Sequence, residues 1–221
     1  MSYIQEKRVD LGLLIRDSFA VLASVKREVA LYLGGLLALA LLAEINSQVR
    51  GIVAIVSLLV FFLGQYFLYQ AILRKAGLLQ DDRKRIFGFV GMTLMLGFAI
   101  YVGFAFLVIP GLLLGAKWIM APTYLVARDR NVFEAIGDSW RASEFNTGQL
   151  VVGYLVFWVL WTVVFIALAG IGEAILPSGG GSQSALAWLA MHLLPVAMMG
   201  LSIATYRQLS DDTNSLTQVF A

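Results

Sequence analysis

Lys117 is the residue of this chain with the clearest chemical potential, because it is an ionisable side chain inside a long apolar segment. Placing a charge in such a segment costs about 2.5–3.5 kcal/mol on insertion scales. Glu44 and Glu173 are the acids expected on the same half of a membrane. We therefore predict that Lys117 forms an ion pair with Glu44 or Glu173. The alternative is a Lys117 side chain that extends to the outer interface without a partner.

A binding interpretation of the same residues is an anion site, in which Lys117 attracts a lipid headgroup or an anionic substrate. The polar side chains of Gln65, Tyr66, Tyr69 and Gln70 lie in another apolar segment and would add contacts. Residues of these types also serve as interhelical hydrogen bonds and interfacial anchors in membrane helices. The sequence leaves both interpretations open.

A second set of candidates is a group of basic residues between two apolar segments. Cations in this position attract anionic lipid headgroups, at about 1 kcal/mol per charge near the membrane surface. We therefore expect membrane lipids as partners, with anionic lipids on the cytoplasmic side. The predicted headgroup contacts are Arg74, Lys75, Arg83, Lys84 and Arg85.

Most catalytic chemistry has no support in the residue types present. The chain has no cysteine and a single histidine, His192, so neither thiolate chemistry nor a zinc or iron–sulfur site is expected. Phosphate-binding, zinc-protease, serine-hydrolase and dinucleotide-binding motifs do not occur. We predict no catalytic residue, no cofactor and no metal. The net charge of only +2 also makes nucleic acid an unexpected partner.

The elements that must position the candidate residues are membrane helices. Hydrophobic residues make up 60% of the chain and charged residues 14%, against about 45–50% and 25% in soluble domains. A bilayer core of about 30 Å needs about 20 helical residues. We therefore predict that residues 1–221 form a single membrane domain and that the chain is an all-α polytopic membrane protein. Its six transmembrane helices are expected at about 29–46, 51–72, 87–109, 110–127, 148–171 and 185–206.

The distribution of basic residues predicts how these spans are threaded. With six spans, every Lys and Arg except Arg50 and Lys117 falls on one side of the membrane. Lys and Arg concentrate in cytoplasmic loops. We therefore expect both termini in the cytoplasm.

Two shorter segments have the pattern of amphipathic helices that lie in the membrane interface, at 10–26 and 131–145. The second begins with Asn131 followed three residues later by Glu134, which predicts a capping box. In the spans, proline and glycine at 109–111 predict a tight turn between the third and fourth spans. Kinks are expected at Pro122 and Pro195.

The two amphipathic segments also resemble each other. Ile15-Arg16-Asp17-Ser18-Phe19 aligns with Ile136-Gly137-Asp138-Ser139-Trp140, and each copy is followed by a few polar residues and then by two spans. We interpret this as a parallel internal repeat with the third and fourth spans inserted between the copies. Residues 213–221 are expected to form a flexible tail.

The run IPGLLLGAKWIMAP at 109–122, followed by AIGDSW at 135–140, resembles a pattern in two groups of bacterial integral membrane proteins. These are the YciC-like proteins and the membrane domain joined to some glycerophosphoryl diester phosphodiesterases. Lys117 stands where that pattern more often has Arg. The resemblance implies a six-span helical fold in the bacterial inner membrane with no established reaction. It implies no phosphodiesterase activity, because the motif run belongs to the membrane domain alone.

These observations favour a non-enzymatic integral membrane protein that associates with lipids or organises the membrane as a scaffold. The first alternative is a small transporter or conduit for an anionic or amphiphilic substrate, and the second is an intramembrane lipid enzyme. Few ionisable groups lie in mid-span, which disfavours ion-coupled transport, and no base is clustered with a nucleophile, which disfavours an enzyme. A homo-oligomer or a membrane-protein partner is compatible with the sequence.

Overall fold

The computed structural model describes residues 9–45, 47–80, 85–128, 130–175 and 185–219. Within these ranges the regular elements are all helices, so the all-helical fold class is confirmed. In chain order they are α1 (Leu11–Ser24), α2 (Lys26–Ile45), a 3₁₀ turn (Ser47–Val49), α3 (Arg50–Lys75), α4 (Ile86–Phe106), α5 (Val108–Lys117), α6 (Ala121–Ala127), α7 (Val132–Ala142), a 3₁₀ turn (Glu144–Asn146), α8 (Thr147–Ile175) and α9 (Ala185–Val219).

Five stretches of the described chain are long and apolar enough to cross a membrane. They are Arg50–Lys75, Ile86–Phe106, Val108–Ala127, Glu144–Ile175 and Ala185–Leu209. Helix α2 is not among them; it carries charged residues at both ends. The chain thus has the helices of a multi-pass membrane protein, while the count of six spans stays a prediction.

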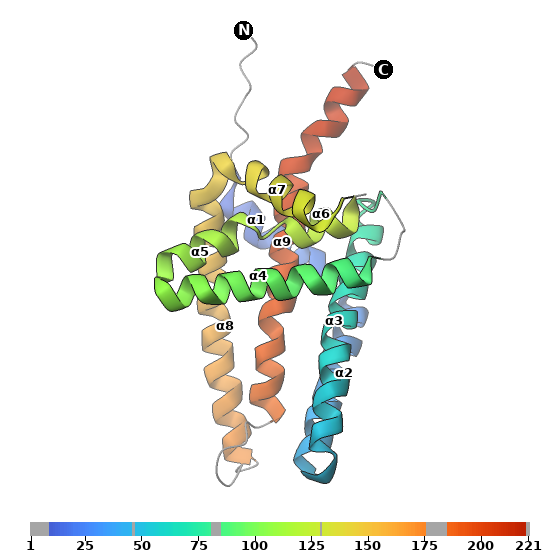
Figure 1. Ribbon diagram of the computed structural model, residues 1–221, viewed down its shortest axis with the longest axis vertical. Helices are drawn as coiled ribbons and strands as arrows, with labels where there is room; N and C mark the ends of the chain where they lie inside the picture. Colours follow the sequence, from blue (N-terminus) through green and yellow to red (C-terminus); the bar gives the residue numbers. More distant parts are fainter. Residues whose placement is uncertain (1–8, 46, 81–84, 129, 176–184, 220–221) are drawn as a thin grey trace.

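Helices α2, α3, α8 and α9 run side by side along the longest axis of the molecule (Figure 1). Helix α8 packs against α9, α9 against α2, and α2 against α3, so α8 and α3 are the outer members of the bundle. We call the end with the first turn of α2 and the last turn of α3 the basic end. The opposite end, where α2 ends and α3 begins, is the far end.

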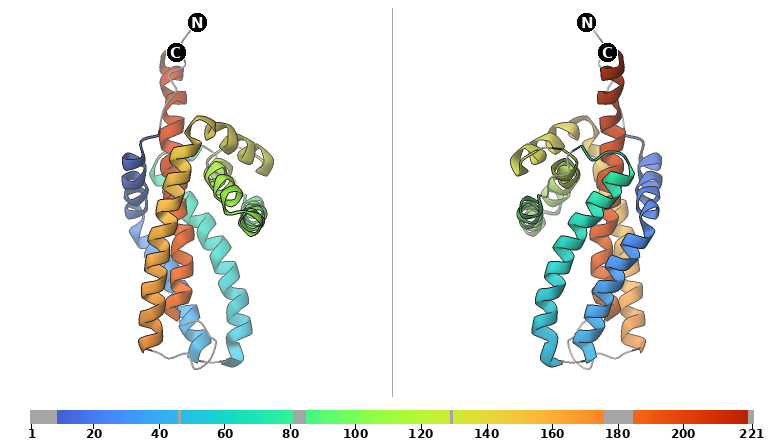
Figure 2. Two further views of the ribbon diagram at one scale, coloured as in Figure 1. Left: turned by 90° about the vertical axis from the view of Figure 1, so that its left-hand side faces the viewer. Right: turned by 90° about the vertical axis from the view of Figure 1, so that its right-hand side faces the viewer.

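Helices α4 and α5 do not follow this direction. They form a hairpin that lies across the bundle, in the half nearer to the basic end (Figures 1 and 2). Helix α4 contacts α3 and α5 contacts α8, so the hairpin bridges the two outer helices of the bundle. The segments predicted as the third and fourth spans are therefore transverse to the four long helices.

The turn of this hairpin lies at Leu107, not at 109–111 as the sequence indicated. Leu107 is extended (φ −158°, ψ 133°), and its N–H donates to the carbonyl of Gly103 at 3.0 Å. Pro110 falls in the first turn of α5, where a missing N–H breaks no intrahelical bond. A Cβ added to Gly103 would lie 3.0 Å from the Cα of Gly111, so the two helices approach closely through these glycines.

The segment predicted as one span at 110–127 is two helices. Helix α5 ends at Lys117 and α6 begins at Ala121, with a turn between them. Pro122 is therefore a residue of the first turn of α6, where proline is tolerated, and not the predicted kink inside a helix. The capping box of α7 is confirmed: the Asn131 side chain accepts from the Glu134 N–H at 2.9 Å, and Glu134 accepts from the Asn131 N–H at 3.0 Å.

Helix α1 lies on the face of the bundle opposite to the hairpin (Figure 2). Its buried face includes Leu14 and Ser18, and it packs mainly on α9. A Cβ added to Gly200 of α9 would lie 2.8 Å from the carbonyl oxygen of Ser18, so only glycine permits this contact. The apolar stripe predicted over 10–26 is therefore partly covered by protein.

The two described ends of the chain lie at the basic end. The Val9 N–H donates to the Asn146 side chain at 2.8 Å, which ties the start of α1 to the start of α8. Helix α9 rises past the bundle at the same end (Figure 1). Its backbone is helical through Val219. The flexibility expected of residues 213–221 stays a prediction.

Candidate functional site

Lys117 is held by α7. Its Nζ lies 4.6 Å from the centre of the Trp140 ring, and its main-chain carbonyl accepts a hydrogen bond from Ser139 at 2.7 Å. The predicted ion pair with Glu44 or Glu173 is not formed. The prediction assumed that the fourth span ran the full depth of the membrane, which would have placed Lys117 about 10 Å in from the outer end of that span. The transverse hairpin instead brings Lys117 to the half of the molecule that contains α7.

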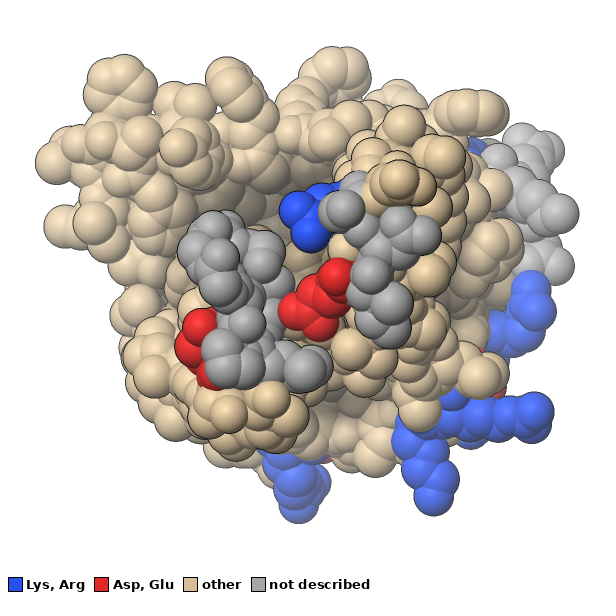
Figure 3. Space-filling model, turned by 90° about the horizontal axis from the view of Figure 1, so that it is seen from below, with Lys and Arg blue, Asp and Glu red and all other residues tan. Residues whose placement is uncertain are grey.

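Glu44 and Glu173 lie near the ends of α2 and α8, at the far end. Glu44 Oε1 accepts from the N–H of Ala185 at 2.8 Å. Ala185 is the first residue of α9, whose N–H groups lack intrahelical partners, so the carboxylate caps this helix. Figure 3 views the molecule from this end and shows a small central group of charged residues, with further Lys and Arg side chains at the lower and right-hand edge of the view. The two acids therefore belong to the helix junctions of the far end.

Three of the predicted headgroup contacts are described, and they lie at the basic end: Arg74, Lys75 and Arg85. Lys75 Nζ donates to the carbonyl oxygen of Ser24, where α1 meets α2, and the neighbouring Arg74 is exposed. The guanidinium of Arg85 donates to the carbonyl of Arg130. Lys75 and Arg85 thus join chain segments as well as carrying charge. Arg83 and Lys84 lie outside the described residues.

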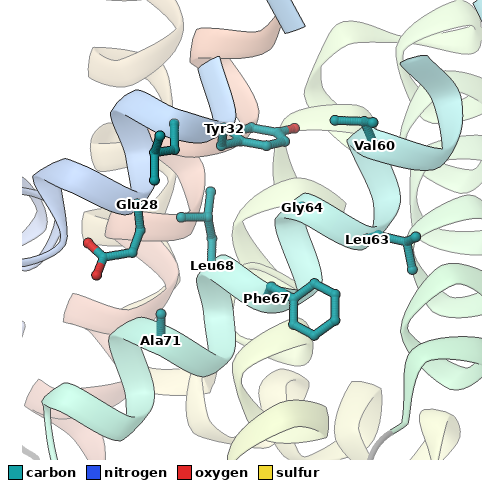
Figure 4. Close-up of a pocket in the computed structure, with 9 residues that line it drawn as sticks. Glu28, Tyr32, Val60, Leu63, Gly64, Phe67, Leu68 and Ala71 are labelled. Carbon is teal, nitrogen blue, oxygen red and sulfur yellow. The ribbon is translucent and has the colours of Figure 1, made fainter. Parts of the chain in front are cut away.

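A groove with a cavity volume of about 540 Å³ runs between α2 and α3 (Figure 4). The ring of Tyr32 lies against Gly64, where an added Cβ would be 2.4 Å from the ring, so this contact requires glycine. Leu63 and Phe67 line the groove and remain 37% and 52% exposed. Apart from Glu28, no lining residue carries a charge. The groove is therefore an open, apolar channel along one side of the helix pair.

Glu28 lies at one end of this groove, beside Leu68 and Ala71 (Figure 4). It is exposed and has no hydrogen-bond or ion-pair partner in the part of the chain that the structure describes. Lys75 is one helical turn beyond Ala71 and reaches Ser24, directly before α2. A carboxylate and an ammonium thus flank the same end of an apolar groove.

A smaller cavity of about 210 Å³ lies between the hairpin and the bundle. Gln65, Thr93 and Tyr154 supply polar groups to its lining, which includes no charged residue. Gln65 is only 6% exposed, and its Nε2 has no hydrogen-bond partner among the described residues. Pro195 of α9 also lines the cavity. This cavity therefore combines apolar walls with an unused hydrogen-bond donor.

The tip of the α4–α5 hairpin is an exposed apolar surface. Phe106, Leu107, Val108 and Ile109 are 81%, 68%, 62% and 69% exposed. Helix α4 has no charged residue, and most of its length is not buried by protein. Contiguous exposed apolar patches of this kind mark contacts with a membrane or another protein.

The sequence did not predict the groove or its acid. Glu28 lies directly before the first predicted span, and its position beside Ala71 depends on how α2 and α3 are paired. The spacing of Glu28 and Tyr32 on one helical face was the available signal. That signal identifies a shared face but not its partner.

Among the described residues, no three His, Asp or Glu side chains lie together so that they could hold a metal ion. No family model, no curated protein and no solved structure matches the chain.

Proposed function

We propose that this chain is a non-enzymatic, multi-pass protein of the bacterial inner membrane that associates with lipids and organises the membrane around it. The observation that carries the proposal is the apolar α4–α5 hairpin, which lies across the bundle with its tip uncovered. A helix that is apolar on all sides is stable in a protein core or in hydrocarbon. A hairpin embedded in one leaflet displaces acyl chains from that leaflet only, which changes the local packing of the bilayer.

The proposed orientation places the basic end, and both termini, in the cytoplasm. The described charges of the far end are Glu44, Arg50 and Glu173. The other described basic residues lie in the half nearer to the basic end, in α1, the first turn of α2, the last turn of α3, the position before α4, the segments from α5 to α7 and the second half of α9. This distribution agrees with the preference of Lys and Arg for cytoplasmic loops. In this orientation α2, α3, α8 and α9 cross the membrane, and the hairpin enters the cytoplasmic leaflet. Six full crossings would require the hairpin to turn parallel to the bundle.

The internal repeat and the YciC-like resemblance are part of the proposal. In each half, an amphipathic helix precedes a long hairpin, and α1 and α7 lie on different faces of the bundle (Figure 2). The aligned residues Ser18 and Ser139 are both fully buried. Helix α1 packs on α9 of the other half, whereas α7 packs on α6, because the inserted segment occupies the space between α7 and α3. The resemblance itself rests on the motif run at 109–140.

Single cysteines test the depth of the hairpin, since the chain has none of its own. Leu107→Cys reports on the hairpin tip, Gly51→Cys on the far end and Ala76→Cys on the basic end. Each variant is treated with a membrane-impermeant maleimide in intact spheroplasts and in inverted vesicles. We expect Gly51→Cys to react from the outside, Ala76→Cys from the cytoplasmic side, and Leu107→Cys from neither side until the membrane is dissolved.

Reaction of Leu107→Cys from outside, as for Gly51→Cys, would show six full crossings and overturn the single-leaflet proposal. Reaction of Ala76→Cys from outside would overturn the orientation. A second measurement addresses the effect on lipids. The purified protein, reconstituted in giant vesicles, is expected to concentrate on membrane tubes in which the leaflet holding the hairpin is the outer one.

A conduit for an amphiphilic substrate is the second candidate, and the cavity that contains the unpartnered Nε2 of Gln65 favours it. The discriminating probe is a fluorescent phospholipid in proteoliposomes, whose movement between leaflets is followed by dithionite quenching. A scaffold leaves this rate at the level of protein-free vesicles. A faster rate that Gln65→Leu abolishes would identify a conduit instead.

A further inference from the structure

We infer that the groove between α2 and α3 binds one acyl chain of a zwitterionic glycerophospholipid, with the headgroup ammonium at Glu28 and the phosphate at Lys75. The inference rests on the proposed association with lipids and names the ligand of one site.

The length and lining of the groove fit an acyl chain. Along α3 it extends from Val60 to Ala71, which corresponds to about 16 Å at 1.5 Å per residue. Half of a hydrocarbon core of about 30 Å is about 15 Å, so the groove has the depth of one leaflet. Its cavity volume of about 540 Å³ is within the usual range for sites that hold small ligands.

The charged end of the groove fits a headgroup with both signs. Glu28 supplies an exposed carboxylate that has no described partner, and Lys75 supplies an ammonium one turn beyond the lining residue Ala71. An ammonium beside Glu28 would gain a charge-assisted hydrogen bond, and a phosphate would gain one from Lys75. An anionic headgroup without an amine would place its charge beside the Glu28 carboxylate, which is unfavourable.

This site differs in chemistry from the basic residues that follow α3. Those residues attract anionic lipids without regard to the rest of the headgroup. The groove adds a carboxylate at the end of an acyl-chain channel, and this combination favours an amine-bearing lipid. Removing the Glu28 carboxylate should therefore weaken the binding of an amine-bearing lipid in the groove, whereas it should not weaken the binding of anionic lipids to the basic residues.

The test is lipid binding to the full-length protein in detergent, measured by native mass spectrometry. Phosphatidylethanolamine and phosphatidylglycerol with identical acyl chains are the two probes. Glu28→Gln removes the charge at nearly constant size, and Glu144→Gln is the matched control, because Glu144 is an exposed acid outside the groove. We expect Glu28→Gln to weaken phosphatidylethanolamine binding about five- to tenfold, as for one charge-assisted contact, and to leave phosphatidylglycerol binding unchanged or stronger.

A second variant fills the groove. Ala71→Trp is expected to weaken binding of both lipids, and Leu63→Trp, deeper in the groove, replaces it if that protein does not fold. Equal effects of Glu28→Gln on both lipids, or unchanged binding after the groove is filled, would overturn the inference. A dimer in the wild-type spectra that Ala71→Trp dissociates would also overturn it, because a second copy would then occupy the groove.

The outcome is separable from that of the proposed function. A lost headgroup preference with Leu107→Cys still protected would reject only the groove ligand. Labelling of Leu107→Cys from outside, with the preference retained, would reject only the single-leaflet hairpin.

Discussion

The hairpins α2–α3 and α4–α5 are both apolar helix pairs, yet they lie in different directions in the molecule (Figure 1). The first runs along the bundle and turns through Ser47–Val49, directly before Arg50. The second lies across the bundle and turns at Leu107, within four exposed apolar residues. In the proposed orientation the first turn reaches water and the second stays in the membrane, so the polarity of the turn, rather than the length of the helices, would determine how deep each hairpin goes.

The physical reason is the hydrogen bonding of the turn. A turn that leaves the bilayer can have polar side chains and an open backbone, because water satisfies them. A turn that stays in hydrocarbon must bond its own backbone. The α4–α5 turn is short: only Leu107 stands between the two helices, and its N–H donates to the carbonyl of Gly103.

The largest expected effect comes from placing a charge in each turn. In the proposed orientation, Leu107→Arg puts a guanidinium into hydrocarbon and should destabilise the protein by about 2–3 kcal/mol, slightly less than at the bilayer centre. Gly51→Arg, at the exposed start of α3, should change stability by less than about 0.5 kcal/mol. Thermal unfolding in lipid nanodiscs measures both. Equal tolerance of the two arginines would mean that both turns are in water, and the contrast between the hairpins would fail.

The second effect concerns the close contact that allows α5 to fold back on α4. A Cβ added to Gly111 would lie 2.6–2.8 Å from atoms of Phe104, including its main-chain nitrogen. Gly111→Ala should therefore cost about 1–3 kcal/mol through overpacking. Gly91→Ala in α4 is the control, because a Cβ added at Gly91 meets no atom within 4 Å; this variant should be neutral or stabilising by up to about 1 kcal/mol.

These two glycine variants are compared by thermal unfolding and by hydrogen exchange of the α5 amides. Faster exchange in α5 with Gly111→Ala alone would sharpen the comparison, because it would locate the damage in the transverse hairpin. A Gly111→Ala protein as stable as Gly91→Ala would show that the two helices are not held together at this crossing.

The smallest expected effect separates the two accounts of Lys117. Lys117→Met removes its contact with the Trp140 ring and should cost about 0.5–1 kcal/mol. Combined with Trp140→Leu, the loss should be less than the sum of the single losses, and combined with Glu44→Gln it should be additive. Additivity with Trp140→Leu and coupling to Glu44→Gln would instead restore the ion pair that the sequence suggested.

The sequence alone determined the helical class, the positions of the apolar segments within a few residues and the capping box at Asn131, because hydropathy and capping are local properties. It did not determine the partner of Lys117 or the direction of α4 and α5. A hairpin that crosses the membrane and one that enters a single leaflet both begin and end on the same side, so the pattern of basic residues is the same for both.

Only the tertiary structure decided those points and the groove beside Glu28. Packing of α5 on α8 and of α4 on α3 sets the hairpin across the bundle, and this brings Lys117 to Trp140. Pairing of α2 with α3 puts Tyr32 against Gly64 and Glu28 beside Ala71. Contacts between segments far apart in the chain depend on which apolar faces meet, and because these helices are apolar on most sides, the sequence does not single out one pairing.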